Sequence, residues 1–136
     1  MRVLGIDLGL KRIGIAVGDS EYAVTSARPA VEASGTLARD AQSIADLAKR
    51  EQAEALVVGL PLGSGGDDGK IAKAGLKLAE KLRDLGWAVY TVNEALTSVE
   101  AEQNLRREDH KASVRRRLRD GEAARLILER YFDEKD

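Results

Sequence analysis

The run Ala55–Leu62, with the sequence ALVVGLPL, constrains the fold more than any other stretch of the chain. It is short and continuously apolar, and it ends at a Gly-Leu-Pro turn signal, which is typical of a strand buried on both faces. Apolar residues at three- and four-residue spacing predict a helix before it, over Leu37–Arg50, and another after it, from Ile71 to Leu85. Gly86 would end that second helix. This alternation predicts an α/β fold with helices packed on a sheet.

Four further segments complete the predicted sheet. Val3–Leu8 and Arg12–Gly18 are expected to form two strands joined by a short turn, and Tyr22–Val31 gives a weaker strand signal interrupted by Pro29. Trp87–Glu94 predicts a last strand after the second helix. A hairpin-rich start that leads into parallel βα units predicts one mixed sheet with helices on its faces.

The last third of the chain is predicted to be helical with a break. Thr97 and Glu100 form a capping-box pattern for a helix that runs to about Arg107. A polar, basic loop is expected to follow, and then a final helix over about Asp120–Glu134. Because no repeat, linker or boundary interrupts the pattern, residues 1–136 are predicted to form a single domain.

Composition limits the chemistry that is available. The chain has 136 residues, no cysteine and one histidine, His110, which excludes disulfides, thiolate zinc sites and histidine clusters. Any metal must therefore be held by oxygen ligands. The amino terminus lacks a basic-then-apolar signal and no apolar run approaches ~20 residues, so we expect a cytoplasmic protein that does not enter a membrane.

One segment carries an unusual concentration of positive charge. Seven basic and two acidic residues lie between Arg106 and Arg119, a net charge of +5 in a chain whose overall charge is −1. A basic cluster on an acidic background indicates contact with a polyanion. The alternative is a solvated helix end.

Three carboxylates occupy positions where apolar residues would be expected. Asp7 lies inside VLGIDLG, a predicted buried strand, where a lone carboxylate would cost several kcal/mol. Glu94 ends the last predicted strand and Asp120 opens the final helix. If the strands that bear Asp7 and Glu94 are parallel, both acids lie at the same edge of the sheet. The alternatives are a carboxylate bonded to the glycine-rich turn, a solvated acid at the strand end and a helix cap.

Carboxylates that converge need a counter-charge. One ionised pair 4 Å apart costs about 4 kcal/mol at an effective dielectric constant of 20. Divalent cations with open coordination positions, Mg²⁺ or Mn²⁺, remove that penalty and bind phosphates. Two such ions ~3.5–4 Å apart can activate a water and stabilise a leaving oxygen at phosphorus. The acids therefore predict a centre for phosphodiester hydrolysis.

These motifs resemble the YqgF/RuvX family over nearly the whole chain. The similar stretches are GIDLGLKRIGIAVGD, VVGLPLGSGGDDG, NEALTSVEAE and RDGEAARLILERYFDE. The family is described as pre-16S rRNA nucleases and as Holliday-junction-resolvase-like, with a ribonuclease H-like fold. The resemblance implies a five-stranded sheet in the order 3-2-1-4-5, catalytic and metal-ligating roles for Asp7, Glu94 and Asp120, and 5′-end maturation of pre-16S rRNA.

The sequence departs from the family pattern near two of the three acids. Asn93 and Ala95 flank Glu94 where the family usually has Asp and Arg, so any contact of that arginine is missing. Arg119 stands before Asp120 where a hydrophobic residue is common. If one strand separates those of Asp7 and Glu94, their backbones lie ~10 Å apart, a span that two side chains and a metal pair can bridge.

Basic residues near the predicted centre are candidates for binding substrate phosphates. Lys11 and Arg12 follow the turn after Asp7, with an exposed hairpin tip as the alternative. Arg115, Arg116 and Arg117 precede Asp120 and would follow a phosphate backbone. The GSGGDDG loop could present backbone N–H groups to an anion, although it fits neither the Walker A nor the dinucleotide pattern. Because aromatic residues are scarce, we expect phosphate and shape recognition and no base reading.

Three classes of function remain open at this point. The leading hypothesis is a nuclease acting on structured RNA such as pre-rRNA, alone or on ribosomal particles, as a monomer or weak homodimer. Cleavage of branched DNA in recombination and repair is the alternative reaction, and it favours a symmetric dimer. A non-catalytic RNA-binding assembly factor is the alternative of another class. The GIDLG start is also similar to the phosphate loop of actin-like ATPases and sugar kinases, which need two such domains.

Overall fold

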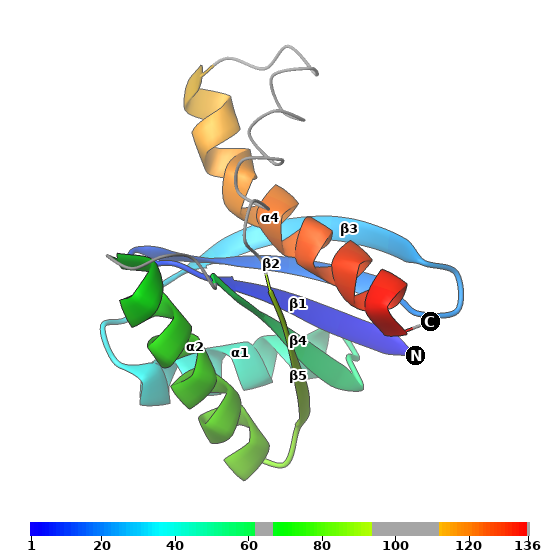
Figure 1. Ribbon diagram of the computed structural model, residues 1–136, viewed down its shortest axis with the longest axis horizontal. Helices are drawn as coiled ribbons and strands as arrows, with labels where there is room; N and C mark the ends of the chain where they lie inside the picture. The colour runs from blue at the N-terminus through cyan, green and yellow to red at the C-terminus, as the bar shows by residue number, and fades with distance from the viewer. Residues whose placement is uncertain (62–66, 94–111, 136) are drawn as a thin grey trace.

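A five-stranded mixed sheet in the order β3-β2-β1-β4-β5 forms the centre of the computed structural model (Figure 1). The structure describes residues 1–61, 67–93 and 112–135, except for the side chains of residues 67, 68, 112–120 and 135. This strand order is the one that the family resemblance implied. The strands are β1 (Arg2–Leu8), β2 (Arg12–Asp19), β3 (Val24–Glu32), β4 (Ala55–Leu60) and β5 (Ala88–Asn93).

The direction of each strand follows from how it is connected. β1, β2 and β3 pair antiparallel through short turns, whereas β1, β4 and β5 pair parallel. Parallel neighbours need a crossover connection, usually a helix. Here α1 (Leu37–Arg50) leads into β4, and α2 (Asp67–Asp84) leads from β4 to β5. The carboxyl ends of β1, β4 and β5 therefore lie at one edge of the sheet.

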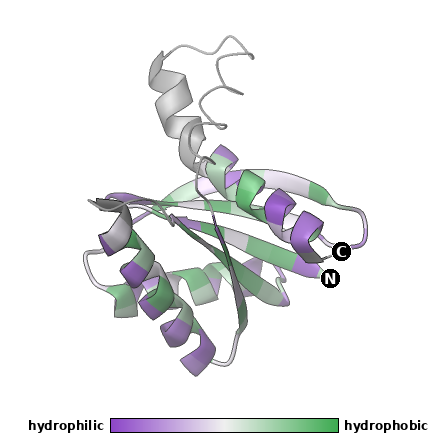
Figure 2. Ribbon diagram, in the orientation of Figure 1, coloured by the Kyte–Doolittle hydropathy of each residue, from purple (hydrophilic) through white to green (hydrophobic). Residues whose placement is uncertain are grey.

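Helices cover both faces of the sheet. α1 and α2 lie on one face, and α4 (Ala112–Lys135) crosses the other (Figure 1). In Figure 2 the two helices α1 and α2 carry hydrophilic and hydrophobic residues in turn, as expected for helices with one buried side. No helix in the described ranges is long and apolar enough to cross a membrane.

Alternation along β1 divides the core into two clusters. Leu4, Ile6 and Leu8 pack with α1 and α2, whereas Val3 packs with the apolar side of α4. The α4 cluster includes Ala124, Ile127 and Tyr131, which belong to the stripe predicted to face the sheet. Successive strand residues point to opposite faces, so the odd-numbered residues of β1 lie on the α4 face.

Two glycines let α4 lie close to the sheet. A Cβ atom on Gly5 of β1 would stand 2.7 Å from Leu128 Cγ and 2.9 Å from the Ala124 carbonyl oxygen. A Cβ atom on Gly121 would stand 3.1 Å from Ala27 Cβ. Because contacts this short force neighbours to move, any larger side chain at Gly5 would push α4 away.

The start of the final helix differs from the prediction. α4 begins at Ala112, so Asp120 lies within the helix and does not open it. The basic loop predicted before Asp120 is therefore wrong, and so is the reading of Asp120 as a helix cap. Four of the nine residues of ASVRRRLRD are Arg, which has a high helix propensity, and the charge of the segment was mistaken for loop character.

Smaller differences concern the other helices. α1 has the predicted bounds, but Thr36 makes no side-chain capping bond, and Ser34 instead donates its backbone N–H to Asp40 Oδ1 at 2.9 Å. α2 begins at Asp67, so the end of the GSGGDDG segment is helical. Gly86 ends α2 as predicted, with φ of 98° and its N–H bonded to the Arg83 carbonyl. The predicted helix from Thr97 to Arg107 lies outside the described residues.

Candidate active site

Asp7 is the next-to-last residue of β1, at the edge where the parallel strands end. It is half-buried in an otherwise buried strand, and it has the same parity as Val3 and Gly5. Its side chain therefore lies on the α4 face, opposite the apolar cluster that contains Ile6 and Leu8. This position explains how a charged residue fits into an apolar strand.

Glycines flank Asp7 on both neighbouring strands. Asp7 pairs with Gly14 of β2 and with Gly59 of β4. Residues paired across strands point to the same face, so neither neighbour places a side chain next to the carboxylate. The sheet surface around Asp7 thus has room for ligands that an apolar neighbour would exclude.

The end of β5 lies level with Asp7, two strands away. Gly59 pairs with both Asp7 and Val92, so the three residues form one row across β1, β4 and β5. β4 lies between β1 and β5, and this is the arrangement for which a backbone spacing of ~10 Å is expected. Glu94 is two residues beyond Val92 in the sequence and lies outside the described residues.

The backbone of Asp120 lies on the same face as Asp7. Asp120 directly precedes Gly121, whose Cβ position would contact Ala27 and the Arg28 carbonyl of β3 and lie 3.8 Å from the Ile15 carbonyl of β2. Ile15 pairs with Ile6, the residue before Asp7. α4 therefore carries Asp120 across the sheet near the level of Asp7. The side chain of Asp120 is outside the described part.

Lys11 and Arg12 are at the same edge of the sheet. Lys11 is exposed in the turn between β1 and β2, and its carbonyl accepts the Ala33 N–H at 2.9 Å. Arg12 begins β2 with the same parity as Gly14, which places it on the α4 face. It is a diagonal neighbour of Asp7, at a typical Cβ separation of ~7–8 Å. A guanidinium there can reach a phosphate beside the carboxylate.

The three arginines predicted to bind phosphate lie in the first part of α4. Arg115, Arg116 and Arg117 are helical in backbone, one turn before Asp120. The helix carries this basic segment past the sheet (Figure 1). Their side chains are not described, so their part in phosphate binding stays a prediction.

Two contacts of α4 were not foreseen from the sequence. Arg130 donates from Nη1 to the Asn93 carbonyl oxygen at 2.6 Å, which ties α4 to the end of β5. Arg125 bonds Glu122 and Glu129, and its hydrogen bond to Glu122 raises the pKa of its guanidinium. The Arg130 contact joins residues 37 positions apart, which no local sequence pattern pairs. The Arg125 contacts had a signal in the sequence, since they follow i, i+3 and i, i+4 spacing.

The oxygen ligands of the proposed centre suit a hard divalent cation. In the part of the chain whose side chains are described, no three acidic or histidine side chains converge, and Asp7 is the only member of the predicted triad included there. RuvC-like nuclease folds generally use divalent metal ions. Asp7 fits that use because its carboxylate is a hard oxygen ligand and its partners on the two neighbouring strands, Gly14 and Gly59, have no side chains.

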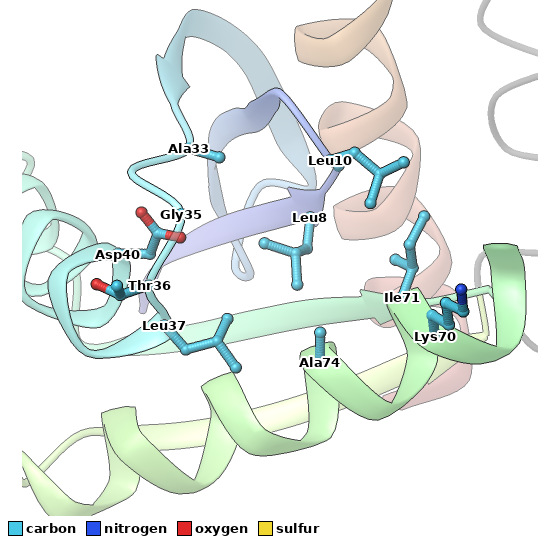
Figure 3. Close-up of a pocket in the computed structure, with 11 residues that line it drawn as sticks. Leu8, Leu10, Ala33, Gly35, Thr36, Leu37, Asp40, Lys70, Ile71 and Ala74 are labelled. Atoms are coloured by element: carbon cyan, nitrogen blue, oxygen red, sulfur yellow. The ribbon is translucent and has the colours of Figure 1, made fainter.

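A separate cavity of about 290 Å³ lies on the opposite face (Figure 3). Its lining is largely apolar and comes from the β1–β2 turn, the start of α1 and α2, with Leu8, Leu37 and Ile71 facing one another. Asp40, 4% exposed, lies at its border with its carboxylate bonded to Ser34. Asp7, the one predicted acid whose side chain is described, does not line this cavity, so we do not place the nuclease centre there.

Comparison with known proteins identifies close relatives. A family model described as "RuvX: Holliday junction resolvase" matches residues 1–134. A protein of Endomicrobium trichonymphae named "Putative pre-16S rRNA nuclease" is 39% identical over 134 residues, covering 97% of this chain and 95% of its own length. A protein of Picosynechococcus with the same name is 37% identical, covering 96% and 90%.

Solved structures show the same fold at low sequence identity. Thermus thermophilus RuvC in complex with a Holliday junction superposes with a TM-score of 0.61 at 15% identity, covering 99% of this chain and 95% of that one. The Fowlpox virus resolvase with its junction DNA gives a TM-score of 0.57 at 14% identity, covering 99% of each chain. These likenesses establish a ribonuclease H-like fold. The family match over residues 1–134 and the relatives at 37–39% identity show that this chain belongs to the RuvX family and is a nuclease.

Proposed function

We propose that this nuclease matures the 5′ end of pre-16S rRNA at a divalent-metal centre formed by Asp7, Glu94 and Asp120. One observation carries the proposal: Asp7 lies between two glycines on the α4 face, at the edge where β1, β4 and β5 end. The relatives named as pre-16S rRNA nucleases support the choice of substrate.

The residues divide the work by charge. Asp7, near the end of β1, would be one ligand of the ions, and Glu94 and Asp120 would complete the set. Bound Mg²⁺ or Mn²⁺, most simply as a pair, would supply an activated water and a counter-charge for the leaving oxygen. Arg12 and Lys11 would hold the phosphate next to the cleaved bond. Arg115, Arg116 and Arg117 would bind the phosphate backbone further along the substrate.

The same reading implies where the protein acts. A precursor of the small-subunit rRNA is found in the cytoplasm with ribosomal particles, so we expect the protein there, as a monomer or weak homodimer. No symmetric pair of cuts is needed to trim one RNA end.

Resolution of branched DNA is the second candidate, and the description of the matching family favours it. Paired cuts in a four-way junction require two active sites related by a two-fold axis. A stable dimer that cleaves junction DNA symmetrically would support this reaction over rRNA processing.

The test is a cleavage assay on labelled rRNA precursor and on junction DNA, with Mn²⁺ or Mg²⁺. We expect the wild type to shorten the precursor. The activity of Asp7→Asn should be lower by more than about a hundredfold, since even residues that only support the metal ligands cost 10–100-fold when mutated. Circular dichroism and thermal unfolding check that the variant is folded. Cleavage of junction DNA alone would favour the resolvase, and a wild type that cleaves neither substrate would leave an RNA-binding factor.

A further inference from the structure

We infer that Tyr90, supported by Tyr131, is a stacking platform for a base in a single-stranded segment of the nucleic acid substrate. The inference rests on the proposed function and specifies the substrate: the strand that enters the site is unpaired next to β5. Single-stranded RNA and DNA share this chemistry, because every base has an aromatic face.

The first argument is the gathering of aromatic rings. Tyr90 and Tyr131 have ring centroids 5.5 Å apart at 32°, and Tyr131 and Phe132 have centroids 5.8 Å apart. The chain has one Trp, one Phe and three Tyr, so three of its five aromatic residues meet here. Aromatic residues are therefore few in the sequence but concentrated at this place in the structure.

The second argument is exposure. Tyr90 is 45% exposed on the edge strand β5, whereas Tyr131 behind it is 9% exposed and Phe132 is 7% exposed. A ring that only filled the core would be covered like the other two. An exposed ring held by a buried one is rigid, so a base can stack on it at little entropic cost.

The third argument is position. Tyr90 pairs with Val57, and Val57 pairs with Gly5, so Tyr90 lies on the α4 face. Asp7 and Val92 lie on the same face, two residues further along β1 and β5. At ordinary strand spacings the Cα atoms of Tyr90 and Asp7 are ~12 Å apart. Arg130, adjacent to Tyr131 in α4, places its guanidinium at the Asn93 carbonyl, at the end of β5. The surface therefore combines an aromatic ring with a cation, as single-strand sites do.

The sequence contained one signal for this role. Tyr90, Val92 and Glu94 share one parity in WAVYTVNE, so the sequence pattern predicts the same face for the ring and for the expected ligand. Stacking tolerates any base, which agrees with the expectation that the protein does not read sequence.

The experiment measures binding apart from cleavage. A labelled unstructured RNA oligonucleotide and its DNA counterpart are titrated with protein in EDTA, and anisotropy gives Kd. Tyr90→Ala is expected to weaken binding by about 5- to 150-fold, while Tyr90→Phe stays close to wild type. The matched control is Tyr22→Ala, since Tyr22 is 73% exposed in the β2–β3 turn, at the opposite end of the sheet, and should change little.

An oligonucleotide series with single abasic positions sharpens the result. One abasic position should weaken binding of the wild type and leave binding of Tyr90→Ala unchanged, because the stacking partner is already gone. Equal Kd values for Tyr90→Ala and wild type, equal losses in Tyr90→Ala and Tyr22→Ala, or no single-strand binding by wild type would each overturn the inference. If one of these results is found while Asp7→Asn still abolishes cleavage, the stacking role of Tyr90 has failed and the proposed nuclease centre has not.

Discussion

The two faces of the sheet use the same strand for opposite purposes. On the α1 and α2 face, β1 presents Leu4, Ile6 and Leu8 to a continuous apolar core. On the α4 face it presents Val3, Gly5 and Asp7, which are in turn apolar, without a side chain and charged. On the first face these three side chains of β1 are all buried. On the α4 face the residues become less buried towards the edge where the parallel strands end.

The contrast explains how the fold tolerates its active site. Ile6 and Leu8 are buried next to Asp7, so the apolar core on the opposite face holds β1 in place at this point. The division holds at the carboxyl end of β1. There, changes on the α4 face should affect cleavage or binding, and changes on the α1 and α2 face should affect stability.

The largest difference between the faces is expected for neighbouring residues of β1. Asp7→Asn should remove cleavage and leave unfolding nearly unchanged, whereas Ile6→Ala should cost about 2–5 kcal/mol of unfolding free energy. Ile6→Ala should keep its cleavage rate per folded molecule. Chemical denaturation together with the cleavage assay checks both, and a loss of cleavage in folded Ile6→Ala would break the division.

Charge reversal separates the faces in substrate binding. Replacing Arg115, Arg116 and Arg117 with Glu should weaken binding and reduce the slope of log Kd against log salt by about 2–3, because phosphate contacts release counterions. The control is the same reversal on α2, at the exposed residues Lys73, Lys77 and Lys81. Equal slopes for wild type and the α4 variant would mean that these arginines lie on a solvated helix surface and do not bind phosphate.

The close packing of α4 can be tested at one glycine. Gly5→Ala would bring a Cβ atom to 2.7 Å from Leu128 Cγ, so we expect a loss of about 1–3 kcal/mol of unfolding free energy and lower cleavage as α4 shifts. Gly69→Ala in α2 meets nothing within 4 Å and should leave stability unchanged or slightly higher. Thermal unfolding of the two variants gives the comparison, and equal melting temperatures would argue against the close approach.

The smallest effect is expected from an ion cluster on the α1 and α2 face. The cluster consists of Glu51, Arg28 and Arg2. The hydrogen bond from Arg28 lowers the pKa of the Glu51 carboxyl, the bond from Arg2 lowers it further, and burial opposes both. A lowered pKa stabilises the fold above the unfolded-state pKa near 4.5, and that stability is lost as pH falls through the folded-state value.

Glu51→Gln should therefore cost about 1 kcal/mol at neutral pH, since its arginine partners are partly exposed, and the difference from wild type should shrink in acid. Unfolding measured from pH 7 to pH 3 checks this. A deficit that stays constant over that range would contradict the assigned role of the carboxylate.

Much of the fold followed from local patterns. The run Ala55–Leu62 and the two amphipathic stripes led to β4, α1 and α2 because burial and periodicity are properties of nearby residues. The start of α4 was missed since Arg115–Arg117 were read for their charge rather than for their helix propensity. The order of the strands came from the family resemblance, not from periodicity.

The site was only partly predictable for a similar reason. The place of Asp7 at a strand end could be read from its strand, but its two glycine neighbours come from strands that begin at residues 12 and 55. The ring contact between Tyr90 and Tyr131 joins residues 41 positions apart in the sequence. Such contacts depend on strand order and on where α4 crosses the sheet, which no local pattern records.

Calorimetric titration with Mn²⁺ tests the central claim most directly, namely that Asp7, Glu94 and Asp120 hold divalent ions together. Wild type should bind Mn²⁺, and Asp7→Asn, Glu94→Gln and Asp120→Asn should each weaken binding at least tenfold. Asp19→Asn, at the opposite end of the sheet, should bind as wild type does. Wild-type affinity in all three site variants would contradict the account.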